Sequence, residues 1–189
     1  TTARAAQEEG RLPAVRIRGW NGMDDDPRVD VVITNSIYAV PEMDGMPHPH
    51  TVDDTFTPMH EGERVPLPNW DGTDYAYFRR ATFLDGDPDQ PLIRDDQAYV
   101  VDRQVVARLP ERVEILFPAM DVGVLVRLTG ATSIGRISDD GLTLENAVVA
   151  GRWSIIDLIS TAENVGICRG TGQYDLLVGQ LEHGAKATR

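Results

Sequence analysis

Hydrophobic and polar residues alternate with a period of two along residues 122–153, which is the pattern of half-buried β-strands. Apolar side chains at every second position predict one strand at residues 122–128 and a second at residues 142–148. The Asp-Asp-Gly sequence at residues 139–141 supplies residues that tolerate positive φ, as a short hairpin loop requires. We therefore expect an antiparallel hairpin within a mostly-β domain.

The same period recurs earlier in the chain but breaks down at residues 41–70, which hold six of the twelve prolines. Proline lacks the N–H that a strand or helix needs, so we expect no regular element in this loop. Loops this long are usually functional or disordered, which makes it the default place to look for a site. The other predicted strands lie at residues 15–17, 28–40, 75–84, 98–109 (two strands around a tight turn) and 113–117.

The spacing of apolar residues becomes helical at residues 155–159. Ser154 is a suitable N-cap with Asp157 three residues further on, and Gly166 is expected to end this helix. A second short helix is predicted at residues 173–182, followed by a stop at Gly184. Its expected buried side consists of Tyr174, Leu176, Leu177 and Leu181.

These elements predict a mainly-β fold, either an antiparallel β-sandwich or an open β-barrel, with two short C-terminal helices capping one end. A chain of 189 residues suits one domain. We place this single β-rich domain at residues 13–189, after a flexible segment at residues 1–12. Thr1 could be an N-terminal nucleophile only if it led directly into a buried strand, so we favour a flexible terminus.

The composition restricts the partners and the compartment. The chain has 18 basic and 30 acidic residues, and its net charge of −12 argues against nucleic acid or an anionic membrane as partner. No apolar run is long enough to span a bilayer. Cys168 is the single cysteine, which excludes an internal disulfide framework and favours a small apolar filler between the helices. Poverty in Cys and Lys predicts an extracytoplasmic protein, whether secreted, periplasmic or on the cell surface.

An acidic loop suggests a calcium site. Alternate carboxylates in a tight loop can direct their oxygens at one hard cation. The loop meets only half of the helix-loop-helix calcium motif, because Gln90 stands where glycine is needed and an aspartate takes the twelfth position. The alternative is a solvated acidic loop. The candidate calcium ligands are Asp85, Asp87, Asp89 and Asp96.

The proline-rich loop suggests a second metal site. His48 and His50 are separated by one residue, a spacing that suits Zn²⁺ or Cu²⁺ in an extended segment. His60 or Asp53 would supply a third ligand, and Asp53 or Glu61 could act as a base. The alternative is an exposed polar loop.

One short sequence occurs twice, fifty positions apart and each time just before a predicted strand. Trp20-Asn-Gly-Met-Asp24 is repeated as Trp70-Asp-Gly-Thr-Asp74. Asx-Gly forms a turn, and the preceding tryptophan can anchor that turn on the core. The sharper hypothesis is that Asp24 and Asp74 are placed alike and contribute to one ion or sugar site beside Trp20 and Trp70.

Part of the chain resembles uncharacterised exported or lipoprotein-type β-rich proteins of soil and predatory bacteria. The resemblance is carried by Trp20-Asn-Gly with its acidic stretch, the Pro68-Asn-Trp-Asp-Gly sequence, Ala98-Tyr-Val, and residues 142–153 ending in Ala-Gly-Arg-Trp. It covers about two thirds of the chain and implies only the extracytoplasmic compartment.

Three functions are consistent with these observations. The favoured one is a non-enzymatic extracytoplasmic binding or assembly module, stabilised by Ca²⁺ and partnered by other protein chains, a surface assembly or a polysaccharide. The second is a metal-assisted hydrolase that uses the histidine loop; the sequence has no Gly-x-Ser-x-Gly, phosphate loop or dinucleotide fingerprint. The third is a small-molecule carrier whose β-barrel is lined by Tyr75, Tyr77, Phe78 and Phe83.

Overall fold

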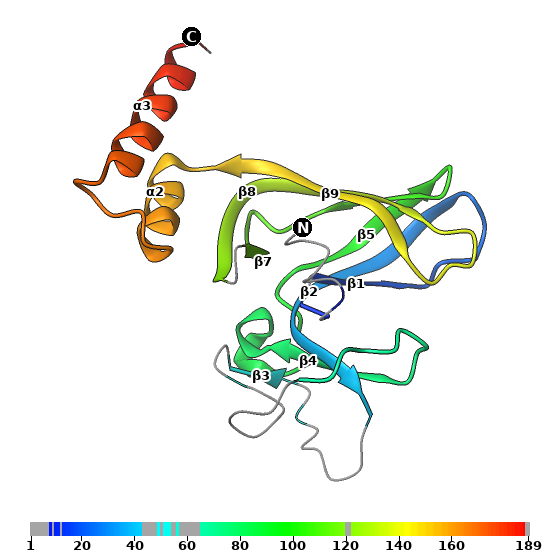
Figure 1. Cartoon of the computed structure of the whole chain (residues 1–189). Coiled ribbons are helices and arrows are strands. Elements are labelled where there is room, and N and C mark those ends of the chain that lie inside the picture. Colours follow the sequence, from blue (N-terminus) through cyan, green and yellow to red (C-terminus); the bar gives the residue numbers. More distant parts are fainter. Residues whose placement is uncertain are drawn as a thin grey trace.

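The computed structural model describes residues 8, 10, 11, 13–42, 49, 51–53, 56, 65–119 and 122–187. Within these residues, nine strands form one mixed sheet and two helices follow near the C-terminus (Figure 1). The predicted mainly-β class with two C-terminal helices is confirmed, and the curved sheet does not close into a barrel.

The chain order of the elements follows the predicted one closely. The strands are β1 (Pro13–Arg18), β2 (Asp26–Pro41), β3 (Thr51–Val52), β4 (Asp74–Arg79), β5 (Arg94–Val101), β6 (Gln104–Arg108), β7 (Arg112–Ala119), β8 (Val122–Ile137) and β9 (Leu144–Trp153). Two short 3₁₀ turns, η1 (Arg80–Thr82) and η2 (Leu84–Gly86), follow β4. The helices are α2 (Ile155–Asn164) and α3 (Gly172–Ala187). The sheet order is β3-β4-β2-β5-β6-β8-β7, with β1 paired to β2 and β9 paired to β8.

The predicted hairpin is confirmed as β8 and β9, which pair antiparallel up to Ile137 and Leu144. Its loop closes through the Ser138 N–H, which donates to the Thr143 carbonyl at 3.0 Å, and Gly141 adopts φ 74°. Both strands are longer than their apolar patterns predicted. β8 continues through residues 129–137 because β6 and β9 pair with it there on opposite sides.

The longest strand on the N-terminal side, β2, joins two parts of the sheet. Its first part pairs with β1 and β5, and its last part pairs with β4, with a shift in register between Ser36 and Tyr38. A main hydrophobic core lies inside the curved sheet and a smaller cluster lies beside β4. Figure 1 shows β3 and β4 on the lower side of the molecule, away from β8 and β9.

The main core is shared by strands from both ends of the sheet. Val15 of β1 and Val149 of β9 both pack against it, although β1 and β9 are not paired with each other. On another side, the buried side chain of Asn35 links β2 to β7: its Oδ1 accepts from the Leu116 N–H at 3.0 Å and its Nδ2 donates to the Glu114 carbonyl at 3.5 Å. This amide bonds to backbone groups of β7 on the side where no strand of the described sheet pairs with it.

The smaller cluster is built by the pleat of β4. Tyr77, fully buried, packs there with Val40 and Val52, and Tyr75 packs against them. Val52 belongs to β3, which pairs parallel with β4. The expectation of no regular element in residues 41–70 is therefore wrong at Thr51–Val52, because pairing with β4 supplies the hydrogen bonds that this sequence cannot make locally.

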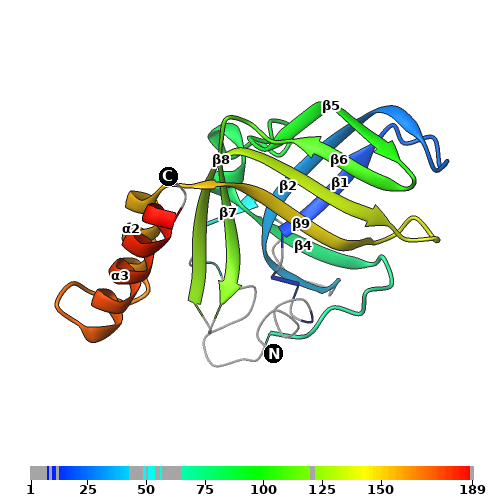
Figure 2. The same cartoon turned by 90° about the horizontal axis from the view of Figure 1, so that it is seen from above.

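The C-terminal helices differ from the prediction in extent and packing. Ser154 caps α2 as expected, since its Oγ accepts from the Asp157 N–H at 3.0 Å. The Thr161 hydroxyl of α2 donates to the Leu125 carbonyl of β8 at 3.0 Å, whereas α3 has no comparable contact with a strand in the part of the chain that the structure describes (Figure 2). The predicted cap of two helices is thus wrong for α3. Gly184 does not end α3, and Leu176 on its supposed buried side is exposed.

Candidate functional site

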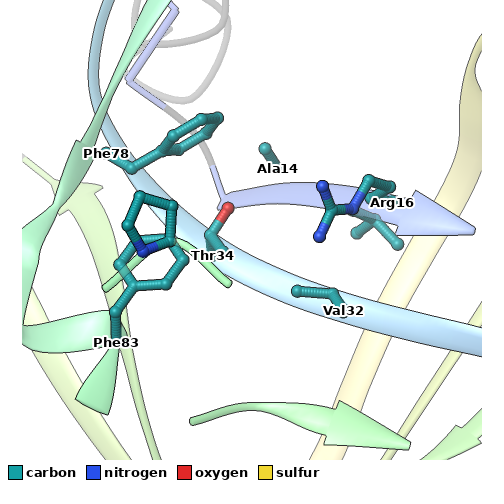
Figure 3. A pocket seen from close by; sticks show the side chains of 8 residues that line it. Ala14, Arg16, Val32, Thr34, Phe78 and Phe83 are labelled. Atoms are coloured by element: carbon teal, nitrogen blue, oxygen red, sulfur yellow. The ribbon is translucent and has the colours of Figure 1, made fainter. Parts of the chain in front are cut away.

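An apolar hollow of about 380 Å³ lies on the outer face of β1 and β2, beneath the end of β4 and the η turns. Figure 3 shows its walls, with Phe78 and Phe83 on one side and the two strands on the other. Its lining residues are Ala14, Val15, Arg16, Val32, Thr34, Phe78, Phe83 and Pro88.

The pairing of β1 with β2 creates one wall. Ala14 lies opposite Thr34 and Arg16 lies opposite Val32, so the four side chains share the face that points away from the main core. Val32 and Thr34 are nonetheless only 3% and 8% exposed, because β4 and the η turns cover them. The outer face of β1 and β2 thereby becomes one wall of the hollow instead of a surface open to solvent.

The opposite wall is held by a tightly folded loop after β4. Phe78 and Phe83 meet edge to face, with ring centroids 6.4 Å apart. The loop closes through the Leu84 N–H, which donates to the Gln90 carbonyl at 2.9 Å. Gly86 adopts φ 76°, and a Cβ there would lie 2.9 Å from the Arg80 side chain, so this close approach requires glycine. The fold of the loop thereby places Phe83 over the hollow.

Two polar side chains border the hollow. The Thr34 hydroxyl points into it (Figure 3) and has no hydrogen-bond partner among the described residues. Arg16 brings its guanidinium to the other end, where it is exposed and forms no ion pair within the described part of the chain. An apolar chamber with one cationic end and one hydroxyl suits an amphiphilic ligand with an anionic group.

A second hollow of about 180 Å³ adjoins the first, and both share Ala14 and Phe78 in their walls. Trp70 forms part of its rim and is 60% exposed, with a φ of 57° that is unusual for a residue with a side chain. We call the two hollows together the β1–β4 groove. It runs from Arg16 past Phe78 to Trp70.

The structure does not bring the two tryptophan turns together. Asp26 and Asp74 start β2 and β4, and the antiparallel pairing of these strands puts Asp74 beside Pro41, at the far end of β2 from Asp26. The counterpart of Asp74 is Asp26 and not the predicted Asp24. Asp24 is exposed and forms a 3.6 Å ion pair with Arg103.

The two turns also place their tryptophans differently. Trp20 packs against the main core, and its Nε1 donates to the Met23 carbonyl at 2.9 Å. Trp70 is exposed on the groove rim. The hypothesis of one shared site for Trp20, Asp24, Trp70 and Asp74 is therefore wrong in its geometry, and only Trp70 lines the groove.

The predicted calcium ligands lie in different secondary-structure elements. Asp85 lies in η2 at φ 53°, whereas Asp96 lies in β5. Asp87 accepts from the Gln90 amide at 2.7 Å and from the Asp89 N–H at 3.0 Å, and these bonds lower the pKa of its carboxyl. Among the described residues, no three His, Cys, Asp or Glu side chains are grouped to hold a metal ion. Calcium binding stays a prediction, and the described acidic residues do not form a ready group of ligands for it.

Most of the second predicted metal site lies outside the described residues, as do Thr1 and Glu61. This holds for His48, His50 and His60. Asp53 is described, and its carbonyl accepts from the Phe56 N–H at 2.9 Å. The zinc or copper hypothesis stays a prediction.

Two further predictions change with the tertiary structure. Cys168 is exposed, so its interpretation as a buried filler between the helices is wrong. The four aromatic residues proposed to line a carrier do not share one face, because the pleat of β4 and the loop after it direct them to two different places. Tyr75 and Tyr77 face the small cluster, whereas Phe78 and Phe83 face the groove.

Sequence reasoning missed Arg16 and Thr34 as site residues. Arg16 lies between Val15 and Ile17 in an alternating segment, which indicated only a strand with one polar face, and Thr34 lies in the predicted strand at residues 28–40. Nothing in that pattern indicated that a later segment covers the face.

Comparison with known proteins adds no relative: no family model matches the chain, and neither the curated proteins nor the solved structures gave a match. In the part of the chain that the structure describes, neither helix has the length and apolar character needed to cross a bilayer.

Proposed function

We propose that the protein is a binding module that takes a small amphiphilic carboxylate in the β1–β4 groove. The observation that carries this proposal is the apolar hollow of about 380 Å³ with the Arg16 guanidinium at its end, where no described residue forms an ion pair with it. Its volume lies at the lower end of the range of about 300–1,000 Å³ typical of small-molecule sites. The proposal refines the predicted non-enzymatic binding module and retains part of the carrier alternative.

The chemistry of the walls supports an apolar body with one anionic end. Burial of an apolar chain against Phe78, Phe83 and Val32 would contribute about 25 cal/mol for each Å² removed from water. A carboxylate can accept two parallel hydrogen bonds from a guanidinium, which makes Arg16 the natural anchor. The Thr34 hydroxyl offers a further donor inside the hollow.

The acidic surface is consistent with a local role for Arg16. The net charge of −12 disfavours anions at long range, so an anionic ligand needs both the apolar contact and the cationic end to bind. The low content of Cys and Lys supports the further proposal that this module works outside the cytoplasm.

Calorimetric titration with octanoate and with 1-octanol tests the proposal. Arg16→Leu should weaken octanoate binding about tenfold, equivalent to about 1.4 kcal/mol, and leave 1-octanol binding nearly unchanged. Arg18→Leu is the matched control, because it removes the same charge from the same strand outside the lining of the hollow. Ala14→Leu, which enlarges a side chain that lines both hollows, should weaken binding of both ligands.

Two results would overturn the proposal. One is the absence of octanoate binding to the wild-type protein at millimolar concentration. The other is an equal loss in Arg16→Leu and Arg18→Leu, which would indicate a general effect of surface charge. Thermal unfolding of each variant separates loss of binding from loss of fold.

A further inference from the structure

Among the strands at the edges of the described sheet, β9 is the longest. β9 has ten residues and is hydrogen-bonded to β8 alone. Along it, every residue except Leu144, Val149 and Trp153 is exposed. An open edge exposes backbone N–H and C=O groups that can pair with another chain.

Other edges of the sheet carry features that oppose such pairing. β1 is short and bears Arg16 and Arg18, and the Asn35 side chain occupies backbone groups of β7. By contrast, the segment from Asn146 to Gly151 in β9 has no charged residue and no proline. Of these three edges, β9 is thus the one whose middle part carries no such feature.

An apolar row on the outer face of the sheet leads to this edge. Tyr99 lies opposite Val106, Val106 opposite Ile134, and Ile134 opposite Val148. Tyr99, Ile134 and Val148 are all exposed, and Val148, on β9 itself, is 59% exposed. A strand added beside β9 would extend this row and shield Val148 from water.

The charges of β9 identify the added strand as another copy of β9. Glu145 and Arg152 flank the uncharged segment, and neither has an ion-pair partner among the described residues. In antiparallel self-pairing centred on Val149, Val148 of each copy lies opposite Ala150 of the other. Arg152 then lies opposite the bulge at Asn146, beside Glu145 of the other copy, and the two-fold symmetry forms this pair twice.

We propose that two copies of this chain associate through antiparallel pairing of their β9 strands. The backbone ladder holds the two sheets together, and the row from Tyr99 to Val148 continues across the two-fold axis. The two Glu145–Arg152 pairs select the antiparallel arrangement, because a parallel pairing in register would set like charges side by side. This association is independent of the ligand proposed for the β1–β4 groove, which lies on β1, β2 and β4.

Charge exchange at these two positions tests the pairing. Sedimentation equilibrium of wild-type protein should show a monomer–dimer equilibrium. Glu145→Arg and Arg152→Glu should each raise the dimer dissociation constant at least tenfold, because each places like charges at both pairs. An equimolar mixture of the two variants should recover association, since the mixed dimer restores both opposite-charge pairs. Arg108→Glu is the control: it reverses the charge of an exposed residue on β6, two strands from the edge.

Each alternative result has a definite meaning. A wild-type protein that stays monomeric at several hundred micromolar overturns the proposal. So does a dimer that both charge reversals leave intact, or one that Arg108→Glu weakens equally. Loss of the dimer in each variant without recovery in the mixture would overturn the antiparallel arrangement. Unchanged circular dichroism and thermal unfolding of each variant show that the fold is retained.

Discussion

The turn at residues 20–26 and the turn at residues 69–74 share two kinds of local hydrogen bond but differ in the conformation and the surroundings of their tryptophans. In the first, Asn21 Oδ1 accepts from the Met23 N–H at 2.8 Å; in the second, Asp71 Oδ1 accepts from the Thr73 N–H at 3.0 Å. In both, an aspartate at the start of the next strand accepts from the N–H of a residue five positions earlier. The repeated Asx-Gly sequence therefore gives the same Asx bond in both turns. The strand-start aspartate, however, bonds to the residue after Trp20 in the first turn and to the residue before Trp70 in the second.

The surroundings of the first turn come from distant segments. Arg103, in the β5–β6 turn, packs over Trp20 with its Cζ 5.5 Å from the ring centroid. The Arg103 N–H donates to the Asp24 carbonyl at 2.8 Å, and the Asp102 N–H donates to Asp25 Oδ1 at 3.0 Å. These contacts tie the first turn to the β5–β6 turn, while Trp20 packs against the main core. Trp70 stays exposed beside a groove. Similar turn sequences thus give one structural anchor and one surface available to a ligand.

Removing the indole side chains of Trp20 and Trp70, one at a time, should show the largest difference in stability between the two turns. Trp20→Ala removes packing on the main core and should lower the free energy of unfolding by about 3 kcal/mol, whereas Trp70→Ala should change it by less than about 0.5 kcal/mol. Urea unfolding measures both. Trp70→Gly is a useful control, because glycine adopts the positive φ of residue 70 without strain and should not destabilise the protein. Equal losses for Trp20→Ala and Trp70→Ala would contradict the distinction.

Truncation of Asp26 and Asp74, the aspartates that start β2 and β4, should show a smaller difference in stability between the two turns. Asp26 is 6% exposed and accepts from the Asn21 and Arg28 N–H groups at 2.9 and 3.1 Å. Asp26→Ala should cost about 2 kcal/mol because two backbone donors lose a charged acceptor. Asp74→Ala should cost about 1 kcal/mol, because water can replace the bonds at its more exposed turn. Urea unfolding at neutral pH checks the order, and a larger loss for Asp74→Ala would reverse our interpretation.

Exchanging the Asx residues of the two turns, with Asp71→Asn in one and Asn21→Asp in the other, should have the smallest effect on stability. The effect should be measurable only at acidic pH. Hydrogen bonds from the Thr73 hydroxyl and backbone N–H lower the pKa of Asp71 from its ordinary value of 3.8. Because the folded pKa is depressed, this stabilisation is present above the unfolded pKa and is lost as the pH falls through the folded pKa. Asp71→Asn should remove this part of the acid dependence. Asn21→Asp should introduce a similar dependence in the first turn.

Urea unfolding as a function of pH, from about pH 6 down to about pH 2, measures this exchange. The two variants should differ from wild type in the slope of stability below about pH 4 and match it in shape above that value. An unchanged acid slope in Asp71→Asn would show that the Thr73 bonds do not favour the charged carboxylate.

The sequence by itself determined the elements that depend on near neighbours. Alternation in residues 122–153 predicted the β8–β9 hairpin, and Ser154 predicted the start of α2, because pleat, turn and cap are local properties. It also predicted the mainly-β class with helices at the end. It failed at β3, whose two residues form a strand only beside β4.

Only the tertiary structure decided the candidate site. Arg16 and Thr34 occupy ordinary outer positions of two strands, and they line a hollow because the loop after β4 covers that face. The aromatic residues of this region were all visible in the sequence, yet the pleat directs Tyr77 to a buried cluster and Phe78 to the groove. Which surfaces meet depends on the bend of β2 and on contacts between residues far apart in sequence, and no local pattern encodes those contacts.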